Sequence, residues 1–200
     1  MRTLLQINAS INNGGQSSQL ANQFVAAFRK SHPDAHVVVR DVGGADTVPH
    51  LSAERFGAFL TESEQRTPAQ QAVVDYSDAL IAEITRAEVI VLGLPMYNFG
   101  VPSQLKAYFD HIARAGETFR YTANGPLGLL GDKKAYVFAA RGGLYAGTAL
   151  DTQTSYVRDF LRFIGIDTIE FVYAEGLHIS AQSKAAGLAS AAAQIERLAA

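Results

Sequence analysis

The sequence has no cysteine among its 200 residues, and no run of apolar residues long enough to cross a membrane. Without cysteine, the chain forms no disulfide, thiolate metal site, iron–sulfur cluster or thiol nucleophile. Neither charge is in large excess, since 17 Lys and Arg face 19 Asp and Glu. This balance argues against a nucleic-acid partner and against the strongly acidic surface of a docking electron carrier. The first residues lack the long apolar stretch of a secretory signal, so we expect a cytoplasmic protein without membrane insertion.

Enough apolar sequence is present for a globular fold, because 48% of the residues are hydrophobic and 18% are charged. A chain of this length buries about 70% of its unfolded surface and needs no covalent or metal crosslink. We find no internal repeat and no linker, and therefore expect residues 1–200 to form a single domain.

Short apolar runs alternate with longer helical patterns along the chain. This alternation predicts an α/β fold with a doubly wound, five-stranded parallel sheet and helices on both faces. The expected strands are 4–7, 37–39, 89–94, 135–139 and 169–173. The expected helices are 18–30, 53–60, 68–86 (with Thr67 as its N-cap), 103–114, 152–164 and 181–198. We expect residues 116–131 to form a long irregular excursion, a functional flap or an interface arm.

Three loops of unusual composition, 9–18, 95–102 and 140–147, follow the carboxyl ends of predicted strands, where parallel sheets bind ligands. The first loop precedes a helix N-terminus, which favours anions. Its side chains can supply hydrogen bonds to a phosphate without Lys or Arg, and they are Ser10, Gln16, Ser17 and Ser18. The alternative is an ordinary serine N-cap followed by a solvated loop.

The second and third loops suit a flat ligand. Pro95 and Pro102 stiffen the second loop, whose central side chains are Met96, Tyr97, Asn98 and Phe99. In the third loop, the glycines of Ala140-Arg141-Gly142-Gly143 allow the backbone to approach a ligand closely. The alternatives are a cap over the core for the second loop and a plain tight turn for the third.

The phosphate-binding signatures G-x-x-x-x-G-K-[ST] and G-x-G-x-x-G are both missing, which disfavours a P-loop NTPase and a dinucleotide held in a Rossmann crevice. A mononucleotide with a flat ring remains, with its phosphate at the first loop and its ring against the other two. Flavin mononucleotide (FMN) fits this description best.

Several stretches resemble the FMN-dependent NADH-azoreductases, also described as NAD(P)H:quinone oxidoreductases of flavodoxin-like fold. These stretches are PMYNF (95–99), QLKAYFD (104–110), ARAGETFRYT (113–122), RGG (141–143) and FVYAEG (171–176). The resemblance implies strand order 2-1-3-4-5 and a homodimer with two FMN sites, each lined partly by the other subunit. It also implies that Ser10, Gln16, Ser17 and Ser18 hold the phosphate and ribityl chain, while residues 96–99 and 140–143 contact the ring. Ala140 departs from the family pattern, which usually has a hydroxyl residue there.

The implied activity is a two-electron transfer from NADH or NADPH, with hydride carried by flavin N5 and no catalytic side chain. Both substrates need the same ring face, so we expect ping-pong turnover. The expected acceptors are small aromatic compounds, namely quinones, azo dyes and nitroaromatic compounds. We expect the substrate pocket to combine Tyr97 and Phe99 with Phe119, Tyr121, Tyr145, Phe163 and Phe171.

Two alternative functions share this fold. A flavodoxin-type FMN carrier would pass single electrons and would be more acidic. A flavin-free receiver-type regulator would need acidic residues after the first strand, where Asn8-Ala9-Ser10 stands.

Overall fold

The computed structural model describes residues 2–199. Its main sheet has five parallel strands in the order β2-β1-β3-β6-β7, which confirms the predicted order 2-1-3-4-5 of consecutive core strands. The strands are β1 (Thr3–Asn8), β2 (His36–Asp41), β3 (Val89–Pro95), β6 (Lys134–Ala140) and β7 (Thr168–Ala174).

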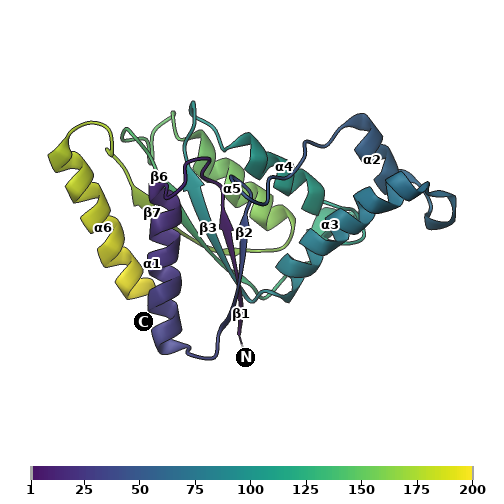
Figure 1. Ribbon diagram of the computed structural model, residues 1–200, viewed down its shortest axis with the longest axis horizontal. Helices are drawn as coiled ribbons and strands as arrows, with labels where there is room; N and C mark the ends of the chain where they lie inside the picture. Colours follow the sequence, from purple (N-terminus) through teal and green to yellow (C-terminus); the bar gives the residue numbers. More distant parts are fainter. Residues whose placement is uncertain (1, 200) are drawn as a thin grey trace.

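Helices cover both faces of this sheet, as predicted. Figure 1 shows α1 (Gln16–Ser31) and α6 (Ala181–Ala199) side by side on one face. The other face carries α3 (Pro68–Arg86), α4 (Ser103–Ile112) and α5 (Thr152–Phe163). The short helix α2 (Ala53–Leu60) and the 3-10 turn Ser63–Gln65 lie near the start of α3, away from the sheet. No helix within residues 2–199 is long and apolar enough to span a membrane.

The central strand β3 shows why the two helix layers form. All seven of its residues are buried, as expected for an apolar run with both faces covered. Val89 and Val91 pack in the cluster under α1 and α6. Ile90 and Leu92 pack in the cluster under α3, α4 and α5. Side chains on a strand alternate between its faces, so one apolar run supplies two cores.

The excursion 116–131 contains a β-hairpin, for which the sequence patterns predicted no strand. Strands β4 (Phe119–Thr122) and β5 (Gly125–Gly128) pair antiparallel around a two-residue turn. Strand β5 was not predicted because it contains glycine and proline, which have a low propensity for strands. Gly128 is required here, because a Cβ at this position would lie 2.0 Å from the backbone nitrogen of Gly165.

The predicted start of α3 is confirmed, whereas that of α1 is wrong by two residues. Thr67 caps α3 through a capping box with Gln70. Helix α1 begins at Gln16 rather than Ser18, and its N-cap is Gly15. Ser17 and Ser18 are therefore the second and third residues of the helix, and neither is its cap.

Candidate functional site

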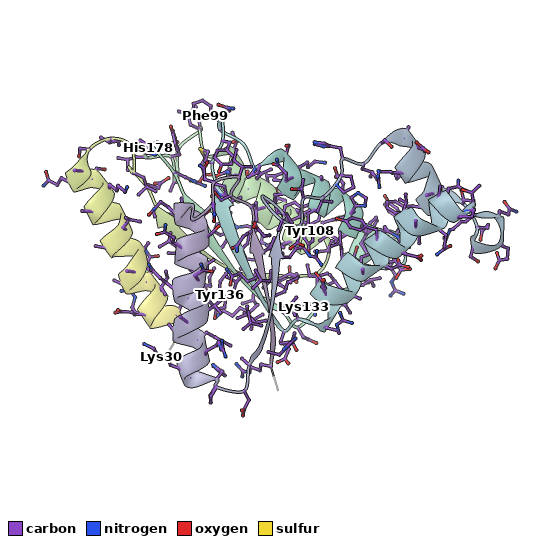
Figure 2. The ribbon with its side chains drawn as sticks, viewed as in Figure 1. Lys30, Phe99, Tyr108, Lys133, Tyr136 and His178 are labelled. Atoms are coloured by element: carbon purple, nitrogen blue, oxygen red, sulfur yellow. The ribbon has the colours of Figure 1, made fainter. Side chains whose placement is uncertain are left out.

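The three loops meet at the carboxyl edge of the sheet. Figure 2 shows Phe99 and His178 together at this end of the molecule, opposite Lys30 and Lys133. A cleft of about 130 Å³ lies between the loops. Its lining comes from all three loops and from the chain after β7: Ser10, Asn12, Gly15, Gln16, Ser17, Pro95, Met96, Tyr97, Ala140, Arg141, Gly142, Leu177 and His178.

The first wall of the cleft is the N-terminus of α1. No side chain caps this helix, since Gly15 has none to offer. The first intrahelical bond runs from the N–H of Gln19 to the carbonyl of Gly15, so the N–H groups of Gln16, Ser17 and Ser18 have no intrahelical acceptor. This finding overturns the alternative of an ordinary serine N-cap. The free N–H groups and the positive end of the helix dipole together favour an anion.

The hydroxyl of Ser17 is a further polar group at this helix terminus without a partner within residues 2–199. Its side chain lies in the cleft wall with the residue only 1% exposed, and its Oγ has no hydrogen-bond partner among the described residues. A buried hydroxyl without a partner costs free energy, about 1–3 kcal/mol. Such a group is expected where a ligand supplies the missing partner.

Ser10 and Tyr97 fasten the first loop to the second. The Ser10 Oγ lies 3.2 Å from the Tyr97 hydroxyl, which also accepts a hydrogen bond from the N–H of Ile11 at 3.3 Å. Ser10 Oγ also accepts from the N–H of Asn12 at 3.2 Å. Both predicted ligand residues are thus engaged within the protein, and their hydroxyls form the junction of the two loops.

The second loop is a tight turn held in a strained conformation. Tyr97 and Gly100 exchange two backbone hydrogen bonds across the turn. Between them, Asn98 and Phe99 have φ angles of 50° and 64°, a left-handed conformation that costs non-glycine residues free energy. The buried amide of Gln153 on α5 donates to the carbonyls of Pro95 and Gly100 and holds the turn in place. The Phe99 ring stays half exposed, edge-on to Tyr145 at 5.7 Å.

The third loop offers its backbone, because the Arg141 side chain is turned inward. Its guanidinium is fully buried and pairs with Asp151 at 2.8 Å and with Glu175 at 3.2 Å. It also lies over the ring of Tyr173. Both terminal nitrogens of the guanidinium are therefore engaged within the protein. The backbone of Arg141 is engaged too, because its N–H donates to the carbonyl of Ala174 at 2.9 Å and its carbonyl accepts from the N–H of Leu177 at 3.2 Å.

The two glycines of the third loop carry free donors. The N–H groups of Gly142 and Gly143 have no acceptor within residues 2–199, whereas their carbonyls accept from His178 and Gly176. A Cβ on Gly142 would lie 3.0 Å from the His178 ring, and one on Gly143 would lie 2.7 Å from the Tyr145 ring. Ala140 bonds to the second loop through its carbonyl, which accepts from the N–H of Met96 at 3.2 Å.

Asp151 illustrates the electrostatics behind the cleft. Burial pushes the pKa of this carboxyl upward, but hydrogen bonds from Arg141 and Thr154 outweigh it, so its pKa lies below the ordinary value. Asp151 also caps α5 by accepting from the N–H of Thr154 at 3.0 Å. One carboxylate thus fixes both the start of a helix and the guanidinium behind the third loop.

Two further hollows adjoin the cleft. Ser18 lies in a polar hollow of about 480 Å³ with Asn8, Asn22 and Asp41, on the β2 side of the first loop. Asn98 lines another of about 640 Å³, between the first and second loops. Small-molecule sites usually measure about 300–1,000 Å³. The cleft alone therefore holds only one end of a nucleotide, and the rest would extend over the neighbouring loops.

The structure separates the predicted substrate aromatics into groups. One group lies at the carboxyl edge of the sheet. It consists of Tyr97 and Phe99 in the second loop and of Tyr145, which packs edge-on against Phe99. Phe119 packs on Phe163 at 4.3 Å and on Tyr121 at 5.4 Å, where α5 ends and leads into the start of β7. Phe171 stacks on Tyr173 along β7. One chain does not assemble these rings into one pocket, and their role in binding substrate stays a prediction.

Sequence reasoning missed five residues around the cleft. Asp151, Gln153 and Glu175 support the loops from behind, and Leu177 and His178 line the cleft itself. Asp151 carried a usable signal, because Asp immediately before a predicted helix is a preferred N-cap. Glu175 belonged to a stretch shared with the resembled family, yet nothing in that stretch says which group it contacts.

Comparison with known proteins finds one family and several relatives that match almost the whole chain. Residues 2–199 match the family described as "Flavodoxin-like fold". The FMN-dependent NADH:quinone oxidoreductase of Cellvibrio japonicus is 56% identical over 198 residues, which cover 98% of each chain. FMN-dependent NADH:quinone oxidoreductase 6 of Burkholderia lata is 55% identical over 96% of each chain.

Solved structures of two azoreductases share the fold over almost the whole chain. An azoreductase from Bacillus anthracis superimposes with a TM-score of 0.91 at 27% identity, covering 100% of this chain and 99% of its own. An FMN-dependent NADH-azoreductase from the same species, in complex with FMN, has a TM-score of 0.90 at 25% identity, covering 100% and 98% of the two chains.

Proposed function

The chain belongs to the flavodoxin-like fold family, and from this premise we propose that it is an FMN-dependent oxidoreductase that transfers electron pairs from NADH to quinones and azo compounds. Relatives named for FMN, NADH and quinone at more than half identity support the proposal, as does the FMN complex of a structural neighbour. We further propose that residues 1–200 form a single FMN-binding domain.

One observation of the structure carries this proposal: the orphaned Ser17 hydroxyl at the uncapped N-terminus of α1. A phosphate there would receive the free N–H groups of Gln16, Ser17 and Ser18 and the Ser17 hydroxyl. The residues present therefore fit a phosphate monoester. The cleft needs no Lys or Arg for this, because backbone donors and the helix dipole offset the anionic charge.

The flat ring of FMN would lie against the second and third loops. Met96, Tyr97, Asn98 and Phe99 would support it, and the free N–H groups of Gly142 and Gly143 would donate to its edge. When bound, FMN supplies the two-electron chemistry that links oxidation of NADH to reduction of the acceptor. The protein binds and orients the reactants, and its inward-turned Arg141 leaves the cleft without an accessible Lys or Arg side chain among residues 2–199.

Stoichiometry follows from the acceptor. A quinone, one NADH and one proton give a hydroquinone and NAD⁺. An azo bond needs two NADH and two protons to give two amines and two NAD⁺, so its cleavage takes two rounds. NADH and the acceptor would occupy the same mouth of the cleft in turn, which makes the kinetics ping-pong.

We also propose a homodimer that completes the substrate pocket. The hairpin β4–β5 exposes Tyr121 by 75% and Leu127 by 46%, and Leu129, directly after the hairpin, is 39% exposed. An exposed apolar surface of this kind is typical of an interface. The group of Phe119, Tyr121 and Phe163 lies away from its own cleft, and a second copy could bring it over the ring.

The test begins with the purified protein, which should be yellow or turn yellow with added FMN, and should release FMN on denaturation. Double-reciprocal plots of NADH oxidation at several fixed quinone concentrations should be parallel. Intersecting plots would exclude ping-pong turnover, and a protein that takes up no FMN would overturn the whole proposal. Photoreduction that stops at one electron would favour a flavodoxin-type carrier.

A further inference from the structure

The third loop rests on a buried cluster of charges that neither the comparisons nor the proposed function assigns. We propose that Glu175 is a positioning residue for FMN, which shapes the third loop and, with Asp151, places a net negative charge behind it that disfavours reduced FMN. The inference deepens the proposed function and rests on FMN binding at this site.

Glu175 acts on the shape of the loop through three hydrogen bonds to one oxygen. Its Oε1 accepts from the backbone N–H groups of Tyr145 and Ala146, both at 2.9 Å, and from Arg141 at 3.2 Å. The next residue, Gly176, donates its N–H to the carbonyl of Gly143 at 2.9 Å. The end of β7 thus holds the loop at both sides of its exposed tip.

This bonding pattern leaves two backbone donors of the third loop unused, just before its exposed tip at Leu144. The carboxylate takes the N–H groups of residues 145 and 146, and the carbonyls of Gly142 and Gly143 face His178 and Gly176. The N–H groups of Gly142 and Gly143 remain without an acceptor in the described part of the chain. A loop held in this way presents two N–H donors that are already oriented. This lowers the entropic cost of binding a flat ring whose edge carries hydrogen-bond acceptors.

The same cluster has an electrostatic consequence. Asp151 and Glu175 face the single guanidinium of Arg141, so the cluster carries one net negative charge. The guanidinium is fully buried, and the Asp151 and Glu175 side chains are only 7% and 14% exposed. Water therefore screens this charge poorly. Two-electron reduction would put added negative charge on the flavin ring. The negative cluster behind the third loop would repel that charge and so destabilise reduced FMN relative to oxidised FMN.

The geometric part is tested with Glu175→Ala and Glu175→Gln. Removing the side chain in Glu175→Ala frees the N–H groups of Tyr145 and Ala146, and the dissociation constant for oxidised FMN should rise about 10-fold or more. Glu175→Gln keeps a carbonyl oxygen as the acceptor and should restore the affinity to within about 2-fold of wild type. Fluorescence titration of the apoprotein with FMN measures both constants.

The electrostatic part is tested with Glu175→Gln alone. Neutralising the cluster should make reduced FMN bind about 3- to 10-fold tighter relative to oxidised FMN. Anaerobic redox titration measures this change as a rise in the midpoint potential of the bound FMN. A tenfold change in the ratio of the two dissociation constants corresponds to about 30 mV for a two-electron couple. Glu170→Gln is the matched control, because Glu170 lies exposed on the same strand without a contact to the loop.

Each result decides one part. Wild-type affinity for FMN in Glu175→Ala would overturn the positioning role, as would a Glu175→Gln variant as weak as Glu175→Ala. An unchanged potential in Glu175→Gln, or an equal rise in Glu170→Gln, would overturn the electrostatic role.

Failure of the proposed function looks different, because wild-type protein would then take up no FMN. If Glu175→Ala does not fold, Glu175→Gln and Glu170→Gln still decide the electrostatic part, and Glu175→Asp, whose shorter side chain withdraws the acceptor, replaces Glu175→Ala.

Discussion

Helices α1 and α3 begin in opposite ways, and the difference separates binding from stability. At α3, Thr67 and Gln70 satisfy each other's backbone N–H groups in a capping box. At α1, Gly15 supplies no side chain, and the buried Ser17 hydroxyl has no partner among residues 2–199. The satisfied terminus stabilises the fold. The unsatisfied terminus lies in the cleft, where a ligand can use its donors.

Helix α5 shows a third arrangement, because a charged residue caps it. Asp151 accepts from the N–H of Thr154 and pairs with the buried Arg141. A cap that also belongs to a buried charge cluster should matter most for stability, since its removal takes away the helix N-cap and one of the two carboxylates that bind the Arg141 guanidinium. The three termini therefore predict three outcomes of different size.

The largest effect is expected for Asp151→Ala, which should lower the free energy of unfolding by about 3 kcal/mol, from the N-cap and from the charged hydrogen bond to Arg141 together. Loss of the cap and of the ion pair both contribute. Urea denaturation of the apoprotein measures it without the stabilisation that bound FMN would add. Asp159→Ala is the control, because Asp159 lies exposed on the same helix, and it should change stability by less than about 0.5 kcal/mol.

The pH dependence of this effect has a defined sign. The pKa of Asp151 is lower in the folded protein than its ordinary value of 3.8, so its carboxylate contributes stability above that pH. The contribution is lost as the pH falls through the folded pKa. The stability difference between wild type and Asp151→Asn should therefore narrow on acidification below pH 3.8. A difference that widens there would contradict this assignment.

The next effect concerns binding. Ser17→Ala should weaken FMN binding about 10- to 100-fold, because a hydrogen bond to a charged group contributes about 1.5–3 kcal/mol. The apoprotein should be as stable as wild type or more so, since the change removes a buried hydroxyl that has no partner. FMN titration and urea denaturation test the two statements. Ser155→Ala, at an exposed serine of α5, should alter neither.

The smallest effect is expected at α3. Thr67→Ala should lower the free energy of unfolding by about 1 kcal/mol, because the N–H of Gln70 loses its acceptor. FMN affinity should stay within about 2-fold of wild type, because this terminus lies outside the cleft. A loss of affinity comparable to that of Ser17→Ala would show that the two termini are not separable.

The five parallel strands and the two helix layers were predictable from the sequence patterns, and the strand order followed from the family resemblance. Runs such as 89–94 are apolar on both faces of a strand, and only a central parallel strand buries both. Thr67 followed by Pro68 marked the start of α3 with specific residue chemistry. Where local preferences and burial agree, the pattern is sufficient.

The hairpin β4–β5 and the start of α1 were not predictable in the same way. Gly125, Pro126 and Gly128 are poor strand formers, and β5 exists because it pairs with β4 and packs against Gly165. At α1, serine is the better cap by preference, yet Gly15 takes this position. A Cβ there would lie 2.1 Å from the Ser10 Oγ, so the neighbouring loop selects the glycine.

The candidate site shows the same division. Ser10, Ser17 and Tyr97 were nominated by their place after strand ends, and the structure brings them to one cleft. Arg141 was nominated because of its loop, but its side chain points into the protein and away from the cleft. It does so because it pairs there with Asp151 and Glu175, and no local pattern in the sequence shows that packing brings these two residues to it.

The sequence by itself determined the fold and the edge of the sheet where a ligand would bind, because hydrophobic periodicity and strand ends are local properties of the chain. Only the tertiary structure decided which polar groups are satisfied. Hydrogen bonds such as those that the third loop donates to the Glu175 carboxylate join residues about thirty positions apart. Whether a donor such as the Ser17 hydroxyl is left free depends on every neighbour that packing brings to it, and no local pattern records those neighbours.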